Sequence, residues 1–329
     1  MSRNVLTALA FTSLLVLAPL TADSAPIFTT VATFNPAVGD LPESLTIGDD
    51  GSFYLSMSTA TIKRVAPDHT VSSFASLPVT PGAFATGLKF GPDGYLYAAS
   101  AGFGPSPSAA FIWRISPAGV VSQYAALDPS GFPNDLAFDD HGDLFVTDPF
   151  LGLVWKVDHH THAASIWLSD PLLAGNPAHP ALTLHSFGVD GIAFDKDKRS
   201  LYFGNVDFGE ILKTDIQCDG SAGDLEVFAG DAKLLGVDGI AFDKQGTLYA
   251  AINGQDAIAA VDDHGHVTTV VTGSPLDAPS SLVFGNHGND KKNLYISNFA
   301  VLRAFGVRPG APHPSLVSIP VQHGGLPLD

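Results

Sequence analysis

The chain has 329 residues, 45% of them hydrophobic, and a formal net charge of −17. A surface this acidic repels phosphate backbones, so the composition excludes nucleic acid as an expected partner. The 22 phenylalanines exclude a disordered chain, and the single cysteine, Cys218, excludes a disulfide within the chain.

The first residues have the composition of a secretory signal peptide. Arg3 provides a positive start, and residues 5–20 form an apolar run. This run is short and is interrupted by Pro19, which argues against a membrane anchor. We therefore expect residues 1–22 to be cleaved off. The remaining residues, 23–329, are expected to be secreted or periplasmic, with no span across a membrane.

Repeated segments dominate the rest of the chain. The peptide GVDGIAFDK occurs at 188–196 and again at 236–244. Alignment on its apolar run gives six related segments that begin 42 to 56 residues apart: 45–56, 88–100, 136–148, 192–205, 240–252 and 282–298. Each contains an apolar run, a polar turn such as DDG or PDG, and a second run rich in Leu, Tyr and Phe. This order predicts a β-hairpin in every repeat.

Two further strands can follow each hairpin, for example at 62–67 and 70–76. Four strands per repeat at this period are typical of a β-propeller blade. The sequence therefore predicts an all-β fold, a six-bladed β-propeller in one domain, with four-stranded blades around a central channel. We expect residues 27–34 to form an outer strand of the last blade, next to 302–307. The Pro-rich tail, 308–329, is expected to lie over the surface.

One position recurs two residues before each apolar run. In a closed ring of blades, equivalent positions lie at the same height around the axis, so these side chains are expected to converge. All six carry an oxygen atom, and three are carboxylates: Glu43, Thr86, Asn134, Asp190, Asp238 and Ser280.

A hard divalent cation would relieve the repulsion between these carboxylates. Ca²⁺ takes about six to eight oxygen ligands, whereas Zn²⁺ prefers Cys and His, which are absent from these positions. We therefore predict a site for Ca²⁺ or another divalent cation, with Glu43, Asn134, Asp190 and Asp238 as ligands. The alternative is that these polar residues cap turns at the repeat boundaries, and the pattern alone leaves it open.

The second strand of each hairpin returns to the same face, so a second polar set is expected there. Its members are Ser100, Asp148, Asn205, Asn253 and Asn298, which predicts an oxygen-rich channel mouth. The longest gap between repeats contains the loop 169–188, which we expect to overhang this mouth. Within it, His185 is a candidate general base. The Pro/Ser stretch 103–109 is expected to form a second wall.

Three stretches carry a resemblance to a known family: LPESLTIGDDGSFYLS (41–56), FPNDLAFDDHGDLFVTD (132–148) and GVDGIAFDKQGTLYAAI (236–252). They resemble the gluconolactonase and luciferin-regenerating enzyme family, which includes regucalcin-type lactonases. Paraoxonases, diisopropylfluorophosphatase and strictosidine synthase are more distant members of this group. The resemblance extends over roughly residues 27–310.

The resemblance implies a calcium or other divalent ion at the top of the channel. In the family a blade-one Glu, Asn residues of the middle blades and a blade-five Asp bind it, which match Glu43, Asn134 and Asp238. Blade four usually offers Asn, but this chain has Asp190, which adds negative charge. The implied activity is metal-dependent hydrolysis of a small lactone or related ester. Asp238 is the first candidate to activate water, followed by Asp190 and His185.

Two other functions fit a propeller of this kind. It can be a non-catalytic module that binds a protein, peptide or polymer, or a strictosidine-synthase-like enzyme that does not hydrolyse its substrate. A binding module would tolerate Glu43→Gln and Asp238→Asn with little loss of function, whereas the hydrolase would lose metal and turnover together. We expect the protein to be a monomer.

Overall fold

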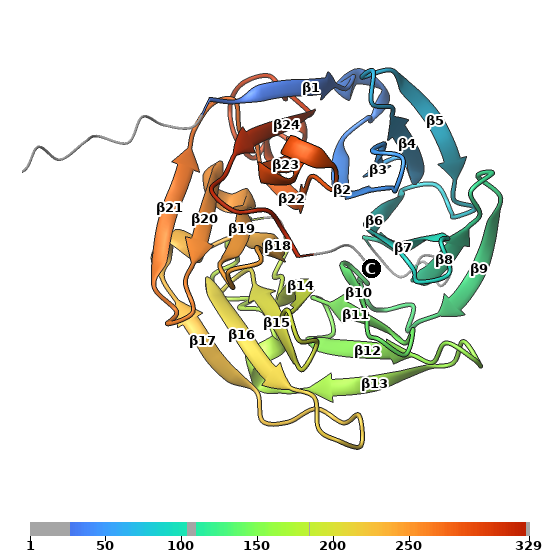
Figure 1. The fold of residues 1–329 in the computed structure, drawn as a ribbon, viewed down its shortest axis with the longest axis vertical. Helices are drawn as coiled ribbons and strands as arrows, with labels where there is room; N and C mark the ends of the chain where they lie inside the picture. The colour runs from blue at the N-terminus through green and yellow to red at the C-terminus, as the bar shows by residue number, and fades with distance from the viewer. Residues whose placement is uncertain (1–26, 104–109, 184, 327–329) are drawn as a thin grey trace, which may run out of the picture.

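The computed structural model describes residues 27–103, 110–183 and 185–326, and all structural statements refer to these residues. They form six four-stranded antiparallel sheets arranged around a central axis (Figure 1). The all-β, six-bladed propeller expected from the repeats is thus confirmed. The predicted signal segment, 1–22, lies outside the described residues. None of the helices in the described ranges is long and apolar enough to cross a membrane.

The first three blades each follow the chain from the axis outward. Blade one comprises β2 (Pro42–Ile47), β3 (Phe53–Met57), β4 (Thr61–Val65) and β5 (Val71–Ser76). Blade two comprises β6 (Ala83–Phe90), β7 (Leu96–Gly102), β8 (Phe111–Ile115) and β9 (Val121–Ala126). Blade three comprises β10 (Leu136–Phe138), β11 (Leu144–Asp148), β12 (Leu153–Val157) and β13 (Ala164–Ser169).

The last three blades include the one that closes the ring. Blade four comprises β14 (Val189–Phe194), β15 (Ser200–Asn205), β16 (Glu210–Asp215) and β17 (Glu226–Gly230). Blade five comprises β18 (Val237–Phe242), β19 (Leu248–Ile252), β20 (Ala257–Val261) and β21 (Val267–Thr272). Blade six comprises β22 (Pro279–Phe284), β23 (Asn293–Asn298), β24 (Ser315–Pro320) and β1 (Thr29–Thr33).

In the described residues, helical structure is confined to short turns between strands. The 3₁₀ turns are η1 (Pro36–Val38), η2 (Pro171–Leu173), η3 (Ala232–Leu234), η4 (Asn253–Gln255) and η5 (Gly288–Lys292). The one α-helical turn in the described ranges is α1 (Val301–Ala304), which follows β23. The strands therefore carry nearly all of the regular structure, as the repeat pattern predicts.

The closure of the ring differs from the sequence prediction in one respect. β1 is the outer strand of blade six, as expected, but it pairs with β24 rather than with residues 302–307. The prediction that the tail lies over the surface is wrong for β24, where Leu316 and Ile319 are fully buried. The apolar, buried β24 supplies the third strand that blade six would otherwise lack. Beyond it, the backbone N–H of Leu326 donates to the carbonyl oxygen of Phe242 beneath the channel (3.2 Å).

Aromatic pairs join neighbouring blades at equivalent places. The Phe that ends the innermost strand of one blade packs on a Tyr or Phe in the second strand of the preceding blade. Five such pairs have ring centroids 4.9–5.7 Å apart: Tyr54–Phe90, Tyr97–Phe138, Phe145–Phe194, Tyr202–Phe242 and Tyr249–Phe284. Such pairs contribute roughly 0.5–1.5 kcal/mol each beyond their buried area. The repeated Phe and Tyr of the hairpins thus explain why the blades stack into a ring.

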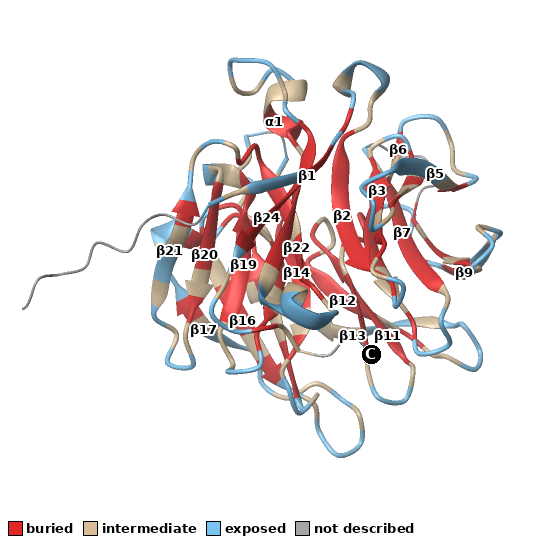
Figure 2. Cartoon of the chain, turned by 45° about the horizontal axis from the view of Figure 1, so that its top comes forward, coloured by how far each residue is buried: buried red, intermediate tan, exposed pale blue. Residues whose placement is uncertain are grey.

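Burial follows distance from the axis. The inner strands of each blade are mostly buried, while the outer strands, such as β5, β9 and β21, are largely exposed or intermediate (Figure 2). The innermost strand of every blade packs against the innermost strands of both neighbouring blades. Side chains at equivalent positions of these six strands therefore face one channel.

Candidate functional site

Backbone bulges open the innermost strands at one end of the channel, which we call the upper end. The pairing register shifts between Pro42 and Leu45 in blade one and between Ala85 and Leu88 in blade two. It shifts again between Val189 and Ile192, and between the equivalent residues of blade five. Each shift brackets one predicted convergent residue. A bulge re-aims side chains and bends the strand, so the bulged position can face the channel axis.

The Asp-Gly pair of the repeated nonapeptide has a packing reason. A Cβ added to Gly191 would lie 2.2 Å from the backbone oxygen of Asp238, and one added to Gly87 would lie 2.2 Å from that of Asn134. Both distances are far below a normal van der Waals contact. Glycine after the convergent residue therefore lets the next blade approach the axis, which brings the neighbouring side chain into the same site.

The four predicted ligands, Glu43, Asn134, Asp190 and Asp238, line one pocket at the upper end, together with Thr86 and Asn253. We call this set of six the oxygen cage. Ser280, the sixth convergent position, is not part of the lining, because its hydroxyl donates to the backbone oxygen of Glu43. The Thr86 hydroxyl likewise donates to the carbonyl oxygen of Pro133 (2.8 Å). For these two residues the alternative of a backbone-capping role applies.

Burial and mutual repulsion disfavour the ionised form of the cage carboxylates. Glu43 is 7% exposed and Asp190 4% exposed, while Asp238 is partly exposed. Burial raises the pKa of all three carboxyls well above the usual range, and repulsion between neighbouring carboxylates raises them further. Among the described residues that line the pocket there is no Lys, Arg or His.

Two side-chain amides donate hydrogen bonds to the cage carboxylates. The Nδ2 group of Asn134 donates to Oδ1 of Asp190, and Nδ2 of Asn253 donates to Oδ2 of Asp238 (3.2 Å). Within the described part of the chain, Oε2 of Glu43 and Oδ1 of Asn253 are buried without a hydrogen-bond partner. Buried oxygen atoms without a donor are rare in proteins, and a water molecule or an ion is the usual partner at such a place.

The donor set fits a hard cation. The lining provides carboxylate, amide and hydroxyl oxygens, and no thiolate or imidazole belongs to its described residues. As the side chains are placed, no group of three or more His, Cys, Asp or Glu in the described ranges could hold a metal ion. Coordination therefore requires amide oxygens as well, and Asn134 would have to turn its Oδ1 toward the ion in place of its present N–H.

The second polar set does not form the mouth, which corrects the sequence prediction. Of its five members only Asn253 lines the pocket. Asp148 accepts from the backbone N–H of Phe132 (2.8 Å), and Asn205 donates to the carbonyl of Leu172 (2.8 Å). Ser100 accepts from the indole N–H of Trp113, and Asn298 donates to the carbonyl of Pro275. The ends of the second strands lie outside the axis. Asp148, Asn205 and Asn298 therefore hold loops, and Ser100 bonds to β8 of its own blade.

The mouth above the cage is apolar. Six phenylalanines line it, together with Leu182 and Val301, and we call the six the phenylalanine rim: Phe84, Phe103, Phe132, Phe187, Phe299 and Phe305. Sequence reasoning missed this feature, although a signal exists. Phe84 and Phe132 stand two residues before a cage residue, and Phe299 directly follows the end of β23.

The long loop 169–188 reaches the mouth as expected, because Leu182 and Phe187 line the pocket. The buried Asp207 carboxylate fixes this loop by accepting from backbone N–H groups, including those of Ala181 (2.8 Å) and Phe187 (3.0 Å). His185 is exposed and stands outside the pocket lining.

The His185 ring stacks on Phe103, with centroids 4.9 Å apart and planes 18° from parallel. Of the expected second wall, 103–109, Phe103 is described and lines the pocket, and 104–109 lie outside the described residues.

Comparisons with known proteins identify the family of the chain. Residues 41–300 match the model of the SMP-30/Gluconolactonase/LRE-like region. The chain belongs to this family. It is 28% identical over 259 residues to a gluconolactonase of Zymomonas mobilis, which covers 72% of this chain and 69% of that protein.

Solved structures show the same fold at lower sequence identity. A regucalcin from Agrobacterium tumefaciens, described as a calcium-binding protein, has a TM-score of 0.66 at 15% identity, over 92% of this chain and 97% of that chain. A gluconolactonase from Xanthomonas campestris has a TM-score of 0.61 at 17% identity, over 92% of this chain and 96% of that chain. At these identities the likeness establishes the propeller fold alone.

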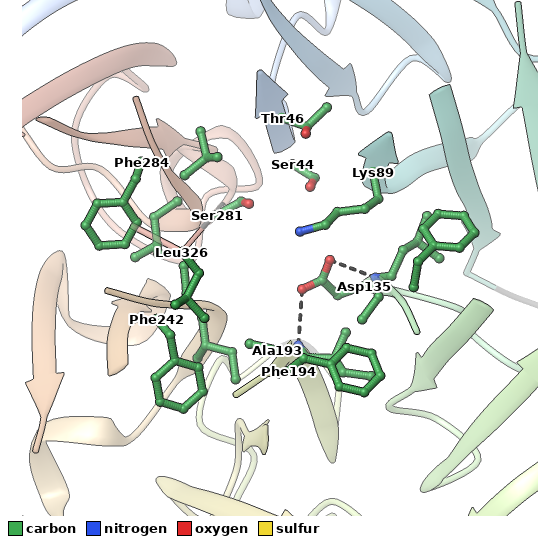
Figure 3. A pocket seen from close by; sticks show the side chains of 18 of the residues that line it. Ser44, Thr46, Lys89, Asp135, Ala193, Phe194, Phe242, Ser281, Phe284 and Leu326 are labelled. Carbon is green, nitrogen blue, oxygen red and sulfur yellow. Dashed lines mark hydrogen bonds between the residues drawn. The ribbon is translucent and has the colours of Figure 1, made fainter. Parts of the chain in front are cut away.

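A second cavity, of about 230 Å³, lies along the channel below the cage (Figure 3). The Asp135 carboxylate accepts there from the backbone N–H groups of Leu136 (2.8 Å) and Ile192 (3.2 Å). Burial raises the pKa of Asp135, while these two donors and the Lys89 charge act in the opposite direction. Figure 3 shows the Lys89 ammonium group directed toward this carboxylate. Leu326 of the C-terminal segment also lines the cavity.

Proposed function

We propose that this protein is a divalent-metal-dependent hydrolase of a lactone or related ester. The observation that carries the proposal is the oxygen cage, in which three carboxylates share one pocket without a basic side chain in its described lining. The family membership and the gluconolactonase relatives support the lactone as substrate class. The calcium-binding regucalcin neighbour supports Ca²⁺ as the ion.

Glu43, Asn134, Asp190 and Asp238 would hold the cation through oxygen atoms, with the partnerless Oε2 of Glu43 as one ligand. A bound divalent cation supplies Lewis acidity, which polarises the carbonyl and stabilises the negative charge that develops on its oxygen. The asparagines contribute neutral oxygens, and Asp190 adds a third negative charge to the site. Together they suit Ca²⁺, which accepts several oxygen ligands in flexible geometry.

Asp238 is the residue that we assign as general base. It is the most accessible of the three cage carboxylates, and the Asn253 amide orients it through the hydrogen bond to Oδ2. Its carboxylate accepts a proton from water as the water oxygen bonds to the carbonyl carbon. The ring C–O bond then breaks, and the same proton passes to the leaving oxygen. The product is the open hydroxy acid, so atoms and charge balance.

The test is hydrolysis of δ-valerolactone followed by pH-stat, together with metal analysis of the purified protein. Chelation is expected to abolish turnover, and Ca²⁺ is expected to restore it. Glu43→Gln and Asp238→Asn should each lower kcat/KM on the order of 10²-fold or more and reduce the bound metal. Glu226→Gln, at an exposed glutamate of β17, is the matched control and should change neither. Full turnover after complete removal of divalent ions would contradict the proposal.

We also propose that the protein is exported, with cleavage after Ala22. The support is the apolar run 5–20 between Arg3 and a stretch of small residues. N-terminal sequencing of the protein recovered outside the cytoplasm should begin at Asp23. Recovery of the whole chain, with Met1 intact, would contradict it.

A further inference from the structure

The strongest unexplained feature is the contrast between the oxygen cage and the phenylalanine rim above it. We propose that the site selects lactones that carry an apolar alkyl or aryl group and discriminates against polyhydroxylated sugar lactones. This inference rests on the proposed function and names the substrate class. It departs from the substrate that the relatives' names indicate, and it follows from the side chains of this chain alone.

Four of the six rim phenylalanines form a continuous aromatic surface. Phe103 contacts Phe84 and Phe132 at centroid distances of 5.3 and 5.2 Å, and Phe132 contacts Phe187 at 5.8 Å. Phe150 fills in behind them, 4.8 Å from Phe132. These residues belong to blades two and three and to the loop that enters blade four. A wall built from two blades and this loop presents ring faces and edges to whatever enters the pocket.

Polar groups are confined to the base of the pocket. The lining consists of the six cage residues and eight apolar side chains. The hydroxyl groups of a sugar lactone that reached beyond the cage would lose water and face phenyl rings without a hydrogen-bond partner, which is unfavourable. Methylene groups or an aromatic ring in the same place would leave water favourably. The pocket thus favours the binding of apolar substituents and disfavours that of hydroxyl groups.

Two rim residues remain open to solvent. Phe103 is 39% exposed and Phe305 48% exposed, and both line the pocket. Large apolar side chains that stay exposed around a pocket mark a surface that a ligand covers. With the lactone carbonyl at the cage, a substituent on the ring would extend between these two side chains. The phenylalanine rim therefore selects the substrate, and the oxygen cage carries out the reaction.

The experiment compares three δ-lactones in the presence of Ca²⁺: unsubstituted δ-valerolactone, δ-decalactone with its alkyl chain, and glucono-δ-lactone. We expect kcat/KM for δ-decalactone to exceed that for glucono-δ-lactone by about tenfold or more. An equal or higher value for glucono-δ-lactone would overturn the inference but leave the proposed function intact. Failure to hydrolyse any of the three would refute the proposed function instead.

A rim variant tests whether the phenylalanine rim is the source of the selection. Phe305→Ser should lower the ratio of kcat/KM for δ-decalactone to that for δ-valerolactone by about three- to tenfold. Phe208→Ser is the matched control, because Phe208 is 49% exposed and does not line the pocket. It should leave the ratio unchanged.

Calorimetric titration with the unreactive lactam of δ-decalactone should show binding at least tenfold tighter than with gluconolactam. This preference should weaken in Phe305→Ser. Equal affinity for both lactams, or an unchanged preference in the variant, would overturn the inference even if no lactone is hydrolysed.

Discussion

The two ends of the channel are built from the same six strands, yet they solve the problem of buried charge in opposite ways. At the upper end, the oxygen cage places three carboxylates together without a basic residue in its described lining. In the lower cavity, Asp135 has the Lys89 ammonium group directed toward it. The propeller fold determines where equivalent positions meet. The residue types at those positions determine whether a buried carboxylate has a basic side chain near it.

The residues that line the lower cavity also occupy equivalent positions in the six repeats. Three residues after each convergent position lies a residue that faces the lower cavity, and five of these six are uncharged: Thr46, Lys89, Ala137, Ala193, Ala241 and Val283. Lys89 is thus the one charged residue among these six, and its ammonium group is directed toward the Asp135 carboxylate (Figure 3). Among the described residues that line the upper pocket, no basic side chain takes this part, so its carboxylates can be neutralised by protonation or by a cation from solution.

The largest expected effect is a pH dependence that arises mainly at the upper end. The folded, cation-free protein holds Glu43, Asp190 and Asp238 at raised pKa values because of burial and mutual repulsion. It therefore binds more protons than the unfolded chain, and the free energy of unfolding falls as pH rises through those values. In chelator, Tm from differential scanning calorimetry should be lower at pH 8 than at pH 5.5. Ca²⁺ should raise Tm more at pH 8.

The double variant Glu43→Gln/Asp190→Asn is the control for the net acidic charge of the whole surface. Its Tm in chelator should depend less on pH, because two of the three carboxyls no longer titrate. A slope as steep as that of the unmodified protein would show that the cage is not its source.

An intermediate effect is expected at the lower end. Lys89→Met leaves the Asp135 carboxylate with backbone donors but without its cation, which should lower the free energy of unfolding by about 2–3 kcal/mol. Urea denaturation in saturating Ca²⁺ measures this change. Lys89→Met/Asp135→Asn should recover most of the loss, and Lys89→Arg should lose less. Equal destabilisation in the single and double variants would show that Lys89 does not act through Asp135.

The smallest effect concerns a paired carboxylate outside the channel. Burial alone would raise the pKa of Asp143, but Lys156 (2.8 Å) and His159 (2.7 Å) lower it to about 2. Asp143 therefore stabilises the fold above its unfolded value near 3.8, and this contribution disappears as pH falls through about 2. Asp143→Asn should cost about 1 kcal/mol at pH 7, measured by urea denaturation.

The difference between Asp143→Asn and the unmodified protein should shrink between pH 4 and pH 2. Asp263→Asn, at an exposed carboxylate, is the control and should stay close to zero throughout. A destabilisation by Asp143→Asn that persists unchanged at pH 2 would indicate lost packing rather than lost charge.

Much of the oxygen cage could be predicted because equivalent positions of the six repeats must lie close together around the axis, even though they are far apart in the sequence. The positions of Glu43, Asn134, Asp190 and Asp238 follow from alignment of the repeats, and the structure places all four in one pocket. Ser280 illustrates the limit. It occupies an equivalent position, but its hydroxyl turns to the backbone of Glu43 in the adjoining blade. A rotamer choice of this kind depends on a neighbour more than two hundred residues away in the chain.

The propeller, the number of blades and the ring of oxygen-bearing positions follow from the repeats, because a repeat whose apolar face must be covered can only stack on copies of itself. The apolar mouth, the use of β24 to complete blade six and the exclusion of Ser100, Asp148, Asn205 and Asn298 from the pocket lining follow only from the folded structure. These features lie where the repeats differ. Their side chains take directions from contacts between loops and blades, and no local pattern encodes such contacts.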